Sequence, residues 1–237
     1  MIVDIKDLSA RYNAKNVLHN ISLSIQEGEN CVIRGESGSG KTTLGKVLAG
    51  SIKYSGELNI NLSSASSLKP MVQFVESWYR FTDLDGDRNF YYQQRYNHQQ
   101  KRDTVTIARE LELYGKEHGL DTAALNGLLA TFNYAKVLDE QLFEISSGEH
   151  KKLQLIKALW LSPQLLIIDQ PYTGLDVKAR GHLNQVLNNY VEKGGTLVLI
   201  SNDTELPECI NRTIFMKDGT LINSNTPLNL HEKELKP

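Results

Sequence analysis

Nine consecutive residues constrain the fold of this chain more than any other feature. The segment Gly35–Thr43 reads Gly-Glu-Ser-Gly-Ser-Gly-Lys-Thr-Thr and fits the pattern G-x-x-x-x-G-K-[ST]. The apolar character of Asn30–Arg34 predicts a short buried strand before it, and Leu44, Val47 and Leu48 recur after it at helical spacing. A glycine-rich loop between a strand and a helix lets backbone N–H groups and the positive helix end surround an anion. We therefore predict a phosphate-binding loop, with a simple connecting turn as the competing interpretation.

Every residue of this phosphate loop is a candidate ligand for a nucleotide. Lys41 would reach the outer phosphates and is also a candidate catalytic residue, while the hydroxyl group of Thr42 would hold Mg²⁺. The predicted cofactor-binding residues of the loop are Gly35, Glu36, Ser37, Gly38, Ser39, Gly40, Lys41, Thr42 and Thr43.

Composition excludes several classes of protein. The 237 residues suffice for one large domain or two small ones, and a net charge of -2 gives no general basic field for nucleic acid. No apolar run approaches the roughly 18 to 20 residues that a membrane span needs. The 2 cysteines and 6 histidines show no metal-ligand spacing. We expect a soluble, cytoplasmic protein that binds no nucleic acid and no metal other than nucleotide-bound Mg²⁺.

The N-terminal part of the chain predicts an antiparallel sheet. Apolar residues alternate with polar ones in Ile2–Leu8 and again in Val17–Ile25, and Gly56–Leu62 restores the same period of two. Tyr12 lies between the first two predicted strands. Its ring could stack on a flat base, or it could be a loop tyrosine packed on the surface, and the residues alone leave both interpretations open.

Two uninterrupted apolar strands follow later in the chain. Leu165–Asp169 and Thr196–Ile200 have the composition of parallel strands that are buried on both faces, and the first ends in a carboxylate. Asp169 would lie at the carboxyl end of its strand, where ligands bind in open α/β sheets and where Mg²⁺ needs an oxygen ligand. Thr213–Ile222 reads as a hairpin with an Asp-Gly turn.

Helical patterns dominate the end of a long insert. From Glu76 the composition shifts toward Gln, Tyr, Asn and Arg; a helix is then predicted over Thr104–Tyr114 after a cap at Asp103/Thr104, and another after Asp121–Thr122. Ser146–Glu149 opens a further helix as a capping motif, and its N-terminus is a second anion site.

The predicted fold class is α/β, a P-loop NTPase fold with a mixed parallel core sheet, an N-terminal antiparallel β-subdomain and a helical insert subdomain. We expect a single domain over 1–237. Residues 1–75 and 163–223 would form the nucleotide-binding core, 76–162 the helical signature subdomain and 224–237 a loose tail.

The order of these pieces resembles the ATP-binding subunit of the ATP-binding cassette (ABC) family over nearly the whole chain. Ile145–Glu149 is similar to the family's signature segment and begins about 23 residues before Asp169. Gly174–Asp176 resembles the family's D-loop, Gln73 its Q-loop glutamine, and Tyr12 its adenine-stacking aromatic. The resemblance therefore favours base stacking for Tyr12.

This resemblance implies an ATPase that converts ATP to ADP and phosphate in a head-to-tail dimer. ATP on the phosphate loop of one subunit would be covered by the signature segment of a second copy, or of a homologous ATPase subunit. The further cofactor-binding residues that it implies are Ser146, Ser147, Gly148 and Glu149. Thr42, Gln73 and Asp169 would hold Mg²⁺ or its waters, and Asp176 would couple the two sites as a catalytic residue.

Two residues depart from the family pattern at positions that carry chemistry. The family places a glutamate after the aspartate of its Walker B strand, whereas this chain has Gln170, and an amide cannot take a proton from water. Asn202 stands where the family has a switch histidine. A positioned base contributes about 10²–10⁴-fold, so we predict slow hydrolysis with Gln170 and Asn202 as altered catalytic positions. Gln170 alone would also fit an engineered substitution that traps ATP, but Asn202 favours a natural sequence with a modified site.

Two functions from different classes remain open at this stage. The first is an ATPase subunit that drives a membrane transporter, with a permease as partner and a location at the inner face of the membrane. The second is a soluble nucleotide-gated switch or clamp; a nucleotide kinase is less favoured because it would leave Ser146 without a purpose. The Ser-Gly-Glu form of the signature, with Tyr91–Arg95, is similar to a branch named for molybdate transport.

Overall fold

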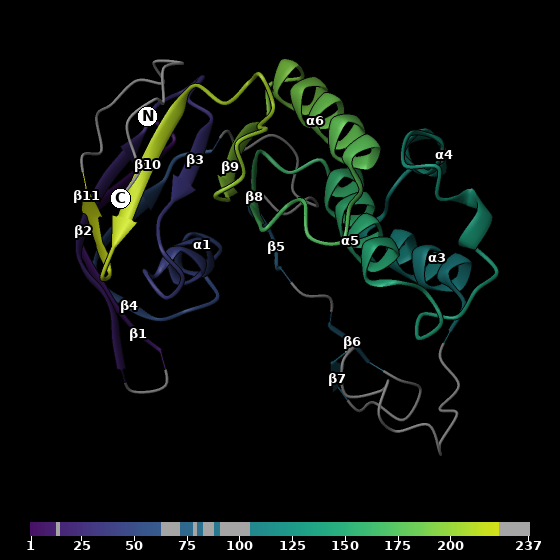
Figure 1. The fold of residues 1–237 in the computed structure, drawn as a ribbon, viewed down its shortest axis with the longest axis horizontal. Coiled ribbons are helices and arrows are strands. Elements are labelled where there is room, and N and C mark those ends of the chain that lie inside the picture. Colours follow the sequence, from purple (N-terminus) through teal and green to yellow (C-terminus); the bar gives the residue numbers. More distant parts are fainter. Residues whose placement is uncertain (13–14, 63–71, 78–79, 83–87, 91–104, 223–237) are drawn as a thin grey trace.

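A central six-stranded sheet positions the elements of the candidate site. The computed structural model describes residues 1–12, 15–62, 72–77, 80–82, 88–90 and 105–222, with side chains given outside 80–82 and 88–90. The strand order is β11-β10-β3-β9-β8-β5. All neighbouring strands run parallel except β10 and β11, which form the expected hairpin (Figure 1). The strands are β3 (Cys31–Arg34), β5 (Val72–Val75), β8 (Leu165–Asp169), β9 (Thr196–Ile200), β10 (Arg212–Lys217) and β11 (Thr220–Ile222).

The predicted antiparallel start of the chain is confirmed as a separate sheet. It contains β1 (Val3–Tyr12), β2 (Lys15–Ile25) and β4 (Tyr54–Ile60) in the order β2-β1-β4, and both pairings are antiparallel. Tyr12 differs from its predicted place because it is the last residue of β1 and pairs with Lys15. The strands extend further than their apolar pattern, since their polar ends pair with each other across the hairpin.

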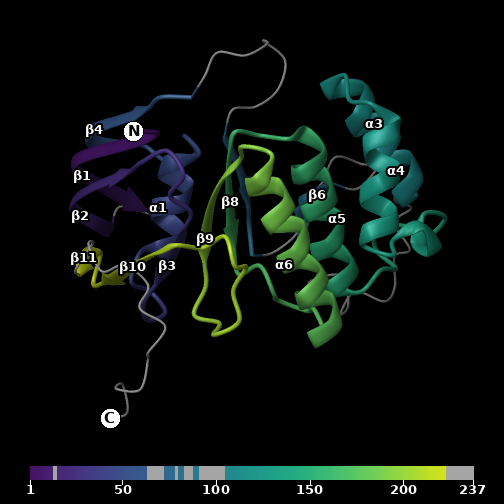
Figure 2. The same cartoon turned by 90° about the horizontal axis from the view of Figure 1, so that it is seen from above.

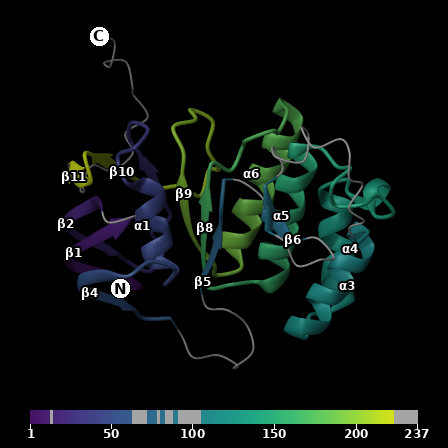
Figure 3. The same cartoon turned by 90° about the horizontal axis from the view of Figure 1, so that it is seen from below.

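Helices cover both faces of the central sheet. Helix α1 (Lys41–Leu48) and the antiparallel sheet lie on one side of β8 and β9, whereas α5 (Ser147–Leu161) and α6 (Val177–Glu192) lie on the other (Figures 2 and 3). Helices α3 (Ile107–His118) and α4 (Thr122–Thr131), with the short 3-10 helix η1 (Ala135–Val137), lie beyond α5. The hairpin of β6 (Arg80–Thr82) and β7 (Arg88–Phe90) adds a strand element to the predicted helical insert.

The strands of the sheet divide their side chains between two cores. Ile167 packs with the antiparallel sheet and α1, while its neighbours Leu166 and Ile168 pack with α3, α4, α5 and α6. This alternation follows from the period of two along a strand. Every residue of β8 and β9 is buried, as their uninterrupted apolar sequences predicted.

Side-chain caps define the starts of the helices. Asp121 caps α4, and Ser146 with Glu149 forms a capping box on α5, both as predicted. The cap predicted at Asp103/Thr104 is wrong: these two residues lie outside the described ranges, and Thr106 caps α3 by accepting a hydrogen bond from the Arg109 amide. The sequence does not distinguish these positions well, because threonine and aspartate have similar preferences for the N-cap position.

Two predicted segments, Tyr91–Arg95 and the tail over 224–237, lie outside the described residues. Within the described part of the chain, no helix combines the length and the hydropathy required to cross a membrane.

Candidate functional site

The phosphate loop connects the end of β3 to the start of α1, as the sequence predicted. Gly35 has φ 147°, and a Cβ at this residue would lie 2.1 Å from the carbonyl oxygen of Met216. Only glycine fits such a close approach to the backbone of β10. Gly40 has φ 96° and makes no side-chain cap, so the first amides of α1 are not covered by a capping side chain. They are therefore free to bind an anion.

Lys41 is the first residue of α1, and its side chain folds back over the loop. Its Nζ donates to the carbonyl oxygens of Gly35 (2.7 Å) and Glu36 (2.6 Å) and to Oγ of Ser39 (3.3 Å). Burial lowers the pKa of Lys41, and the nearby Asp169 carboxylate opposes that shift. The ammonium group thus lies inside the loop that would surround a phosphate.

Thr42 and Asp169 bring the loop and the central sheet together. Oγ1 of Thr42 donates to Oδ2 of Asp169 at 2.7 Å, and the Asp169 residue is 2% exposed. Burial raises the pKa of Asp169, against the lowering effects of the Thr42 hydrogen bond and of Lys151 and Lys41. The other carboxylate oxygen, Oδ1, is buried without a hydrogen-bond partner among the described residues.

These oxygen atoms suit a magnesium ion. A hydroxyl group beside a buried carboxylate with an unpaired oxygen is the hard donor set that Mg²⁺ prefers. Gln73, the third predicted ligand, is half-buried on β5, where it pairs with Leu166 of the Asp169 strand. The residues present therefore fit the ion.

Gln170 leaves the end of β8 in an unusual backbone conformation. Its φ is 50°, in the left-handed region, and the residue is exposed. Its amide donates to the carbonyl oxygen of Ile200 at 3.0 Å, and its carbonyl oxygen accepts from the Thr173 amide at 3.3 Å. Gln170 therefore follows Asp169 directly at the carboxyl end of β8, and the residue is open to solvent.

Asn202 follows β9 and binds the phosphate loop directly. Its Oδ1 accepts from the Gly35 amide (3.1 Å), and its Nδ2 donates to the Gly35 carbonyl oxygen (2.9 Å). Both ends of one side chain thus hold one loop residue. Asn202 therefore braces the phosphate loop, a role that was not predicted from the sequence.

The signature segment lies at the N-terminus of α5. Oε2 of Glu149 accepts from the Ser146 amide and hydroxyl, each at 2.8 Å. Burial would raise the pKa of Glu149, but the hydrogen bonds from Ser146 outweigh it and lower the value. Gly148 packs against the D-loop, since a Cβ on it would lie 2.4 Å from the carbonyl oxygen of Gly174. Asp176, the last D-loop residue, caps α6 through the Ala179 amide (2.8 Å).

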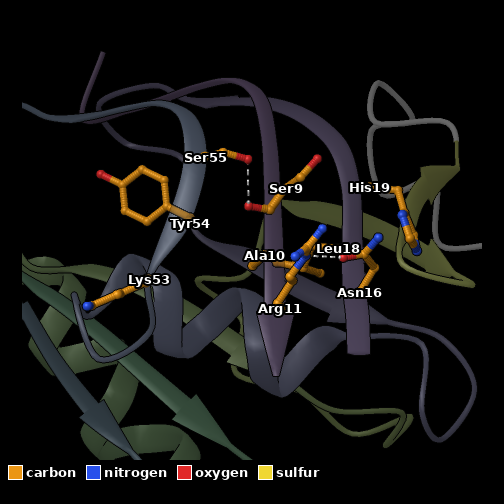
Figure 4. A pocket seen from close by; sticks show the side chains of 9 residues that line it. All are labelled: Ser9, Ala10, Arg11, Asn16, Leu18, His19, Lys53, Tyr54 and Ser55. Atoms are coloured by element: carbon orange, nitrogen blue, oxygen red, sulfur yellow. Dashed lines mark hydrogen bonds between the residues drawn. The ribbon is translucent and has the colours of Figure 1, made fainter. Parts of the chain in front are cut away.

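Tyr12 is 46% exposed at the end of β1. Arg11, which precedes it, lines an open pocket of about 510 Å³ with Asn16 and Tyr54, and Arg11 Nε donates to Asn16 Oδ1 at 2.7 Å (Figure 4). Tyr12 itself does not line this pocket, and its exposure is compatible with either of the two sequence interpretations.

Hydrogen bonds therefore join the predicted site residues in two groups that are adjacent in the chain at Lys41 and Thr42. The first contains Gly35, Glu36, Ser39, Lys41 and Asn202, and the second pairs Thr42 with Asp169. Ser37, Gly38, Gly40 and Thr43 belong to the same loop and helix start, whereas the other predicted residues lie at the end of β1, on β5, after β8 and at the starts of α5 and α6.

Two basic residues near these groups were not predicted, and one of them, Lys151, contacts Asp169 directly. Nζ of Lys151 donates to the carbonyl oxygens of Asp169 (2.9 Å) and Glu76 (3.0 Å), and burial lowers its pKa to about 7, with Asp169 opposing. Arg180 donates to the Leu175 carbonyl oxygen (3.2 Å) and forms an ion pair with Asp203 (3.3 Å). These contacts could not be read from the sequence, because main-chain oxygen acceptors are present in every residue and leave no sequence pattern.

The sequence and the fold of this chain are similar to those of known proteins. The family model described as ABC transporter matches residues 18–173. The chain is 27% identical over 232 residues to a protein of Thermotoga maritima named as a probable metal transport system ATP-binding protein, covering 97% of this chain and 84% of that protein. It is also 28% identical over 235 residues to an ABC transporter ATP-binding protein of Onion yellows phytoplasma. The match covers 97% of this chain but only 38% of the length of that protein.

A solved structure has the same fold. It is a dimeric post-hydrolysis state of an ATP-binding cassette bound to ADP and phosphate, and it superposes with a TM-score of 0.75 at 21% identity. The alignment covers 97% of this chain and 99% of the other. At this level of identity the likeness concerns the fold.

Proposed function

The chain belongs to the ABC transporter family, and we propose that it binds Mg-ATP at the phosphate loop and hydrolyses it slowly in an ATP-sandwiched, head-to-tail dimer. The energy of this cycle would drive a membrane transporter. The observation that carries the proposal is the 2.7 Å hydrogen bond between Thr42 and Asp169 beside the buried ammonium group of Lys41. A cation, an acid with an unpaired oxygen and a free helix N-terminus converge there, as a triphosphate with its metal ion requires.

The phosphate loop supplies the positive charge. Lys41 would exchange its hydrogen bonds with Gly35 and Glu36 for bonds to the outer phosphate oxygens, while the amides from Gly38 to Thr43 bind the inner ones. Tyr12 would stack on the adenine ring. Thr42, Asp169 and Gln73 would hold Mg²⁺ or its waters, and the ion would neutralise charge that develops on the phosphates.

A second copy of the chain would complete the site. The signature segment would offer the amides of Ser147 and Gly148 at the start of α5, since Ser146 already caps the Glu149 amide, and Gly148 holds that helix against the D-loop of its own chain. An anion bound by one phosphate loop could be covered by Ser146–Glu149 of another chain, with Asp176 near the interface. The dimeric state of the solved cassette supports this arrangement.

Slow turnover is proposed from the residues beside the phosphates. Gln170 is presented next to Asp169 but cannot accept a proton, and both functional atoms of Asn202 are bound to Gly35. The site could then orient water without a general base. ATP-driven dimer closure would survive while hydrolysis is slow.

Phosphate release from three proteins tests this function. We expect Gln170→Glu to release phosphate about 10²-fold faster than the unmodified chain, because a carboxylate restores a base. Lys41→Ala should bind no fluorescent ATP analogue and serves as the binding control. Equal turnover of the unmodified chain and Gln170→Glu would contradict slow hydrolysis, and failure of the unmodified chain to bind ATP would contradict the proposal as a whole.

The second candidate is a nucleotide-gated switch or clamp whose output is dimerisation. The exposed amide of Gln170 and the engaged amide of Asn202 favour it, since a clamp benefits from slow hydrolysis. Purification from membranes distinguishes the two. A permease that co-purifies at the inner face of the membrane would support transport, whereas an ATP-stable dimer without a membrane partner would support the clamp.

The molybdate branch remains a finer proposal for the cargo. It is supported by Ser147–Glu149 of the signature segment and by Tyr91–Arg95, which lies outside the described residues. Transport assays with molybdate, or the permease found by co-purification, would test it.

A further inference from the structure

Lys151 is a buried lysine that has no direct role in the proposed binding of ATP. It lies on the second turn of α5, and only 2% of the residue is exposed. Its Nζ bonds two main-chain oxygens, at Asp169 (2.9 Å) and at Glu76 (3.0 Å). These residues end or follow two adjacent parallel strands, β8 and β5. One side chain of the signature helix therefore joins the carboxyl ends of two strands at the site.

Burying an ammonium group is unfavourable unless it is hydrogen-bonded, and Nζ of Lys151 meets this requirement with two main-chain oxygens. The charged groups nearby are the Asp169 carboxylate and Glu76, whose Oε1 lies 3.0 Å from Nζ of Lys46 on α1. The Glu76 carboxylate pairs with Lys46, and Nζ of Lys151 bonds the main-chain oxygens of Glu76 and Asp169.

The Asp169 carbonyl belongs to the peptide unit that precedes Gln170. The N–H of the same peptide donates to the Ile200 carbonyl oxygen at 3.0 Å. Because a peptide unit is planar, fixing its C=O and its N–H fixes its orientation, and with it ψ of Asp169 and φ of Gln170. Gln170 has φ 50°, a conformation that non-glycine residues keep only where the surroundings hold it.

We propose that Lys151 is a positioning residue that holds the Asp169–Gln170 peptide and so fixes residue 170 relative to the Asp169 carboxylate. The same side chain links this orientation to the signature helix that would cover ATP on a partner subunit. The proposal rests on the proposed ATP hydrolysis for its functional consequence. Its structural part, a peptide unit held at its C=O and at its N–H, rests on two hydrogen bonds: Lys151 Nζ to the Asp169 oxygen and the Gln170 amide to the Ile200 oxygen.

A double-mutant cycle tests the functional consequence. We measure kcat and KM for phosphate release in the presence and absence of Gln170→Glu, first with Lys151 and then with Lys151→Met. We expect Gln170→Glu to raise kcat about 10²-fold beside Lys151 but less than about 5-fold beside Lys151→Met, because a base that is misplaced loses most of its effect. KM should change less than about 3-fold, since Lys151 does not contact the phosphate loop.

Lys157→Met is the matched control. Lys157 lies on the same helix and pairs with Glu110 of α3 at 2.6 Å, so it braces α5 without contact with Asp169. We expect this variant to keep the full gain from Gln170→Glu even if its melting temperature falls as much as that of Lys151→Met. An equal gain in all three backgrounds would overturn the proposal, because Lys151 would then contribute only stability.

Hydrogen–deuterium exchange gives a readout that needs no turnover. In the nucleotide-free chain, Lys151→Met should speed exchange of the Gln170 amide at least about 10-fold relative to Lys157→Met. If no variant hydrolyses ATP, the proposed function fails while this exchange rate still decides the role of Lys151. Unchanged exchange overturns the positioning role. Should Lys151→Met not fold, Lys151→Gln, which retains an N–H donor, replaces it in both experiments with a smaller expected effect.

Discussion

Asn202 pairs with Gly35 as one strand residue pairs with another, with its amide group in the place of a backbone peptide. Gly35 lies directly against β10, because a Cβ at this residue would meet the Met216 carbonyl oxygen. The bond to Asn202 holds it from the opposite side, at the end of β9. The Asn202 side chain therefore braces the phosphate loop through both its carbonyl oxygen and its amide nitrogen.

Asn202→Ala should weaken ATP binding and leave the catalytic rate of the bound state nearly unchanged. Losing two partly exposed hydrogen bonds, each worth about 1 kcal/mol at most, predicts an increase in Kd of about 3- to 10-fold. Titration with a fluorescent ATP analogue measures it.

Asn211→Ala is the matched control for that substitution. Asn211 also makes one accepting and one donating bond, before the opposite end of β3, but with two residues: it accepts from the Asn30 amide (2.9 Å) and donates to the Gly28 carbonyl oxygen (2.8 Å). It should destabilise the chain to a similar degree without changing Kd. A similar loss of affinity in both variants would show that Asn202 acts through general stability.

At the scale of elements, the start of α5 and the D-loop are in direct backbone contact. Gly148 leaves no room for a side chain beside the Gly174 carbonyl oxygen, and Gly174 itself has φ 75°. The signature segment and the D-loop thus form one surface within a chain. If dimer closure uses this surface, a change in one of the two segments displaces the other.

Gly148→Ala should reduce ATP-dependent dimer formation while ATP binding by the monomer is preserved. The added Cβ would lie 2.4 Å from the Gly174 oxygen and must separate the two segments. Light scattering with Mg-ATP measures the dimer, and we expect its dissociation constant to rise at least about 10-fold. Gly181→Ala on α6 is the control, because the added Cβ would meet no atom within 4 Å outside its own helix backbone. This variant should stabilise the monomer by up to about 1 kcal/mol. An unchanged dissociation constant of the dimer in Gly148→Ala would show that the contact between Gly148 and Gly174 is not needed for dimer closure.

Local patterns in the sequence predicted the elements that meet at the site, but not how they are held. Gly35–Thr43 and Leu165–Asp169 were recognisable because neighbours in sequence determine a phosphate loop and a buried strand. The contacts of Lys151 and Asn202 were not, since their partners are main-chain groups that every residue carries and that only the tertiary fold selects. The roles assigned to Tyr12, Gln170 and the signature segment stay predictions.

At the scale of the whole molecule, the central sheet belongs to both hydrophobic cores at once. Alternate residues of β3, β8 and β9 face α1 and the antiparallel sheet on one side and the long helices on the other. Neither core can open without exposing strands that the other core needs. We therefore expect the described parts of the chain to unfold cooperatively, with the phosphate loop anchored where the two cores meet.

The thiol of Cys31 can report that cooperative unfolding. Cys31 is fully buried in β3, four residues before the phosphate loop, and burial raises its pKa to about 12. Near pH 8 the folded state therefore presents no reactive thiolate, and labelling requires an opening in which the pKa returns toward 9.0. In a Cys209→Ser variant Cys31 is the remaining cysteine of the chain.

ATP should slow the labelling of Cys31 in proportion to its binding. A ligand at about 100 times its Kd stabilises the folded state by about 2.7 kcal/mol, so a thiol reagent should react about 100-fold more slowly if labelling requires global unfolding. The measurement follows the reagent's absorbance at protein concentrations that keep the chain monomeric. With Lys41→Ala added, ATP should have no effect. A labelling rate that ATP does not change in the Lys41 protein would mean that β3 opens locally, and the shared sheet would then not unite the two cores into one unfolding unit.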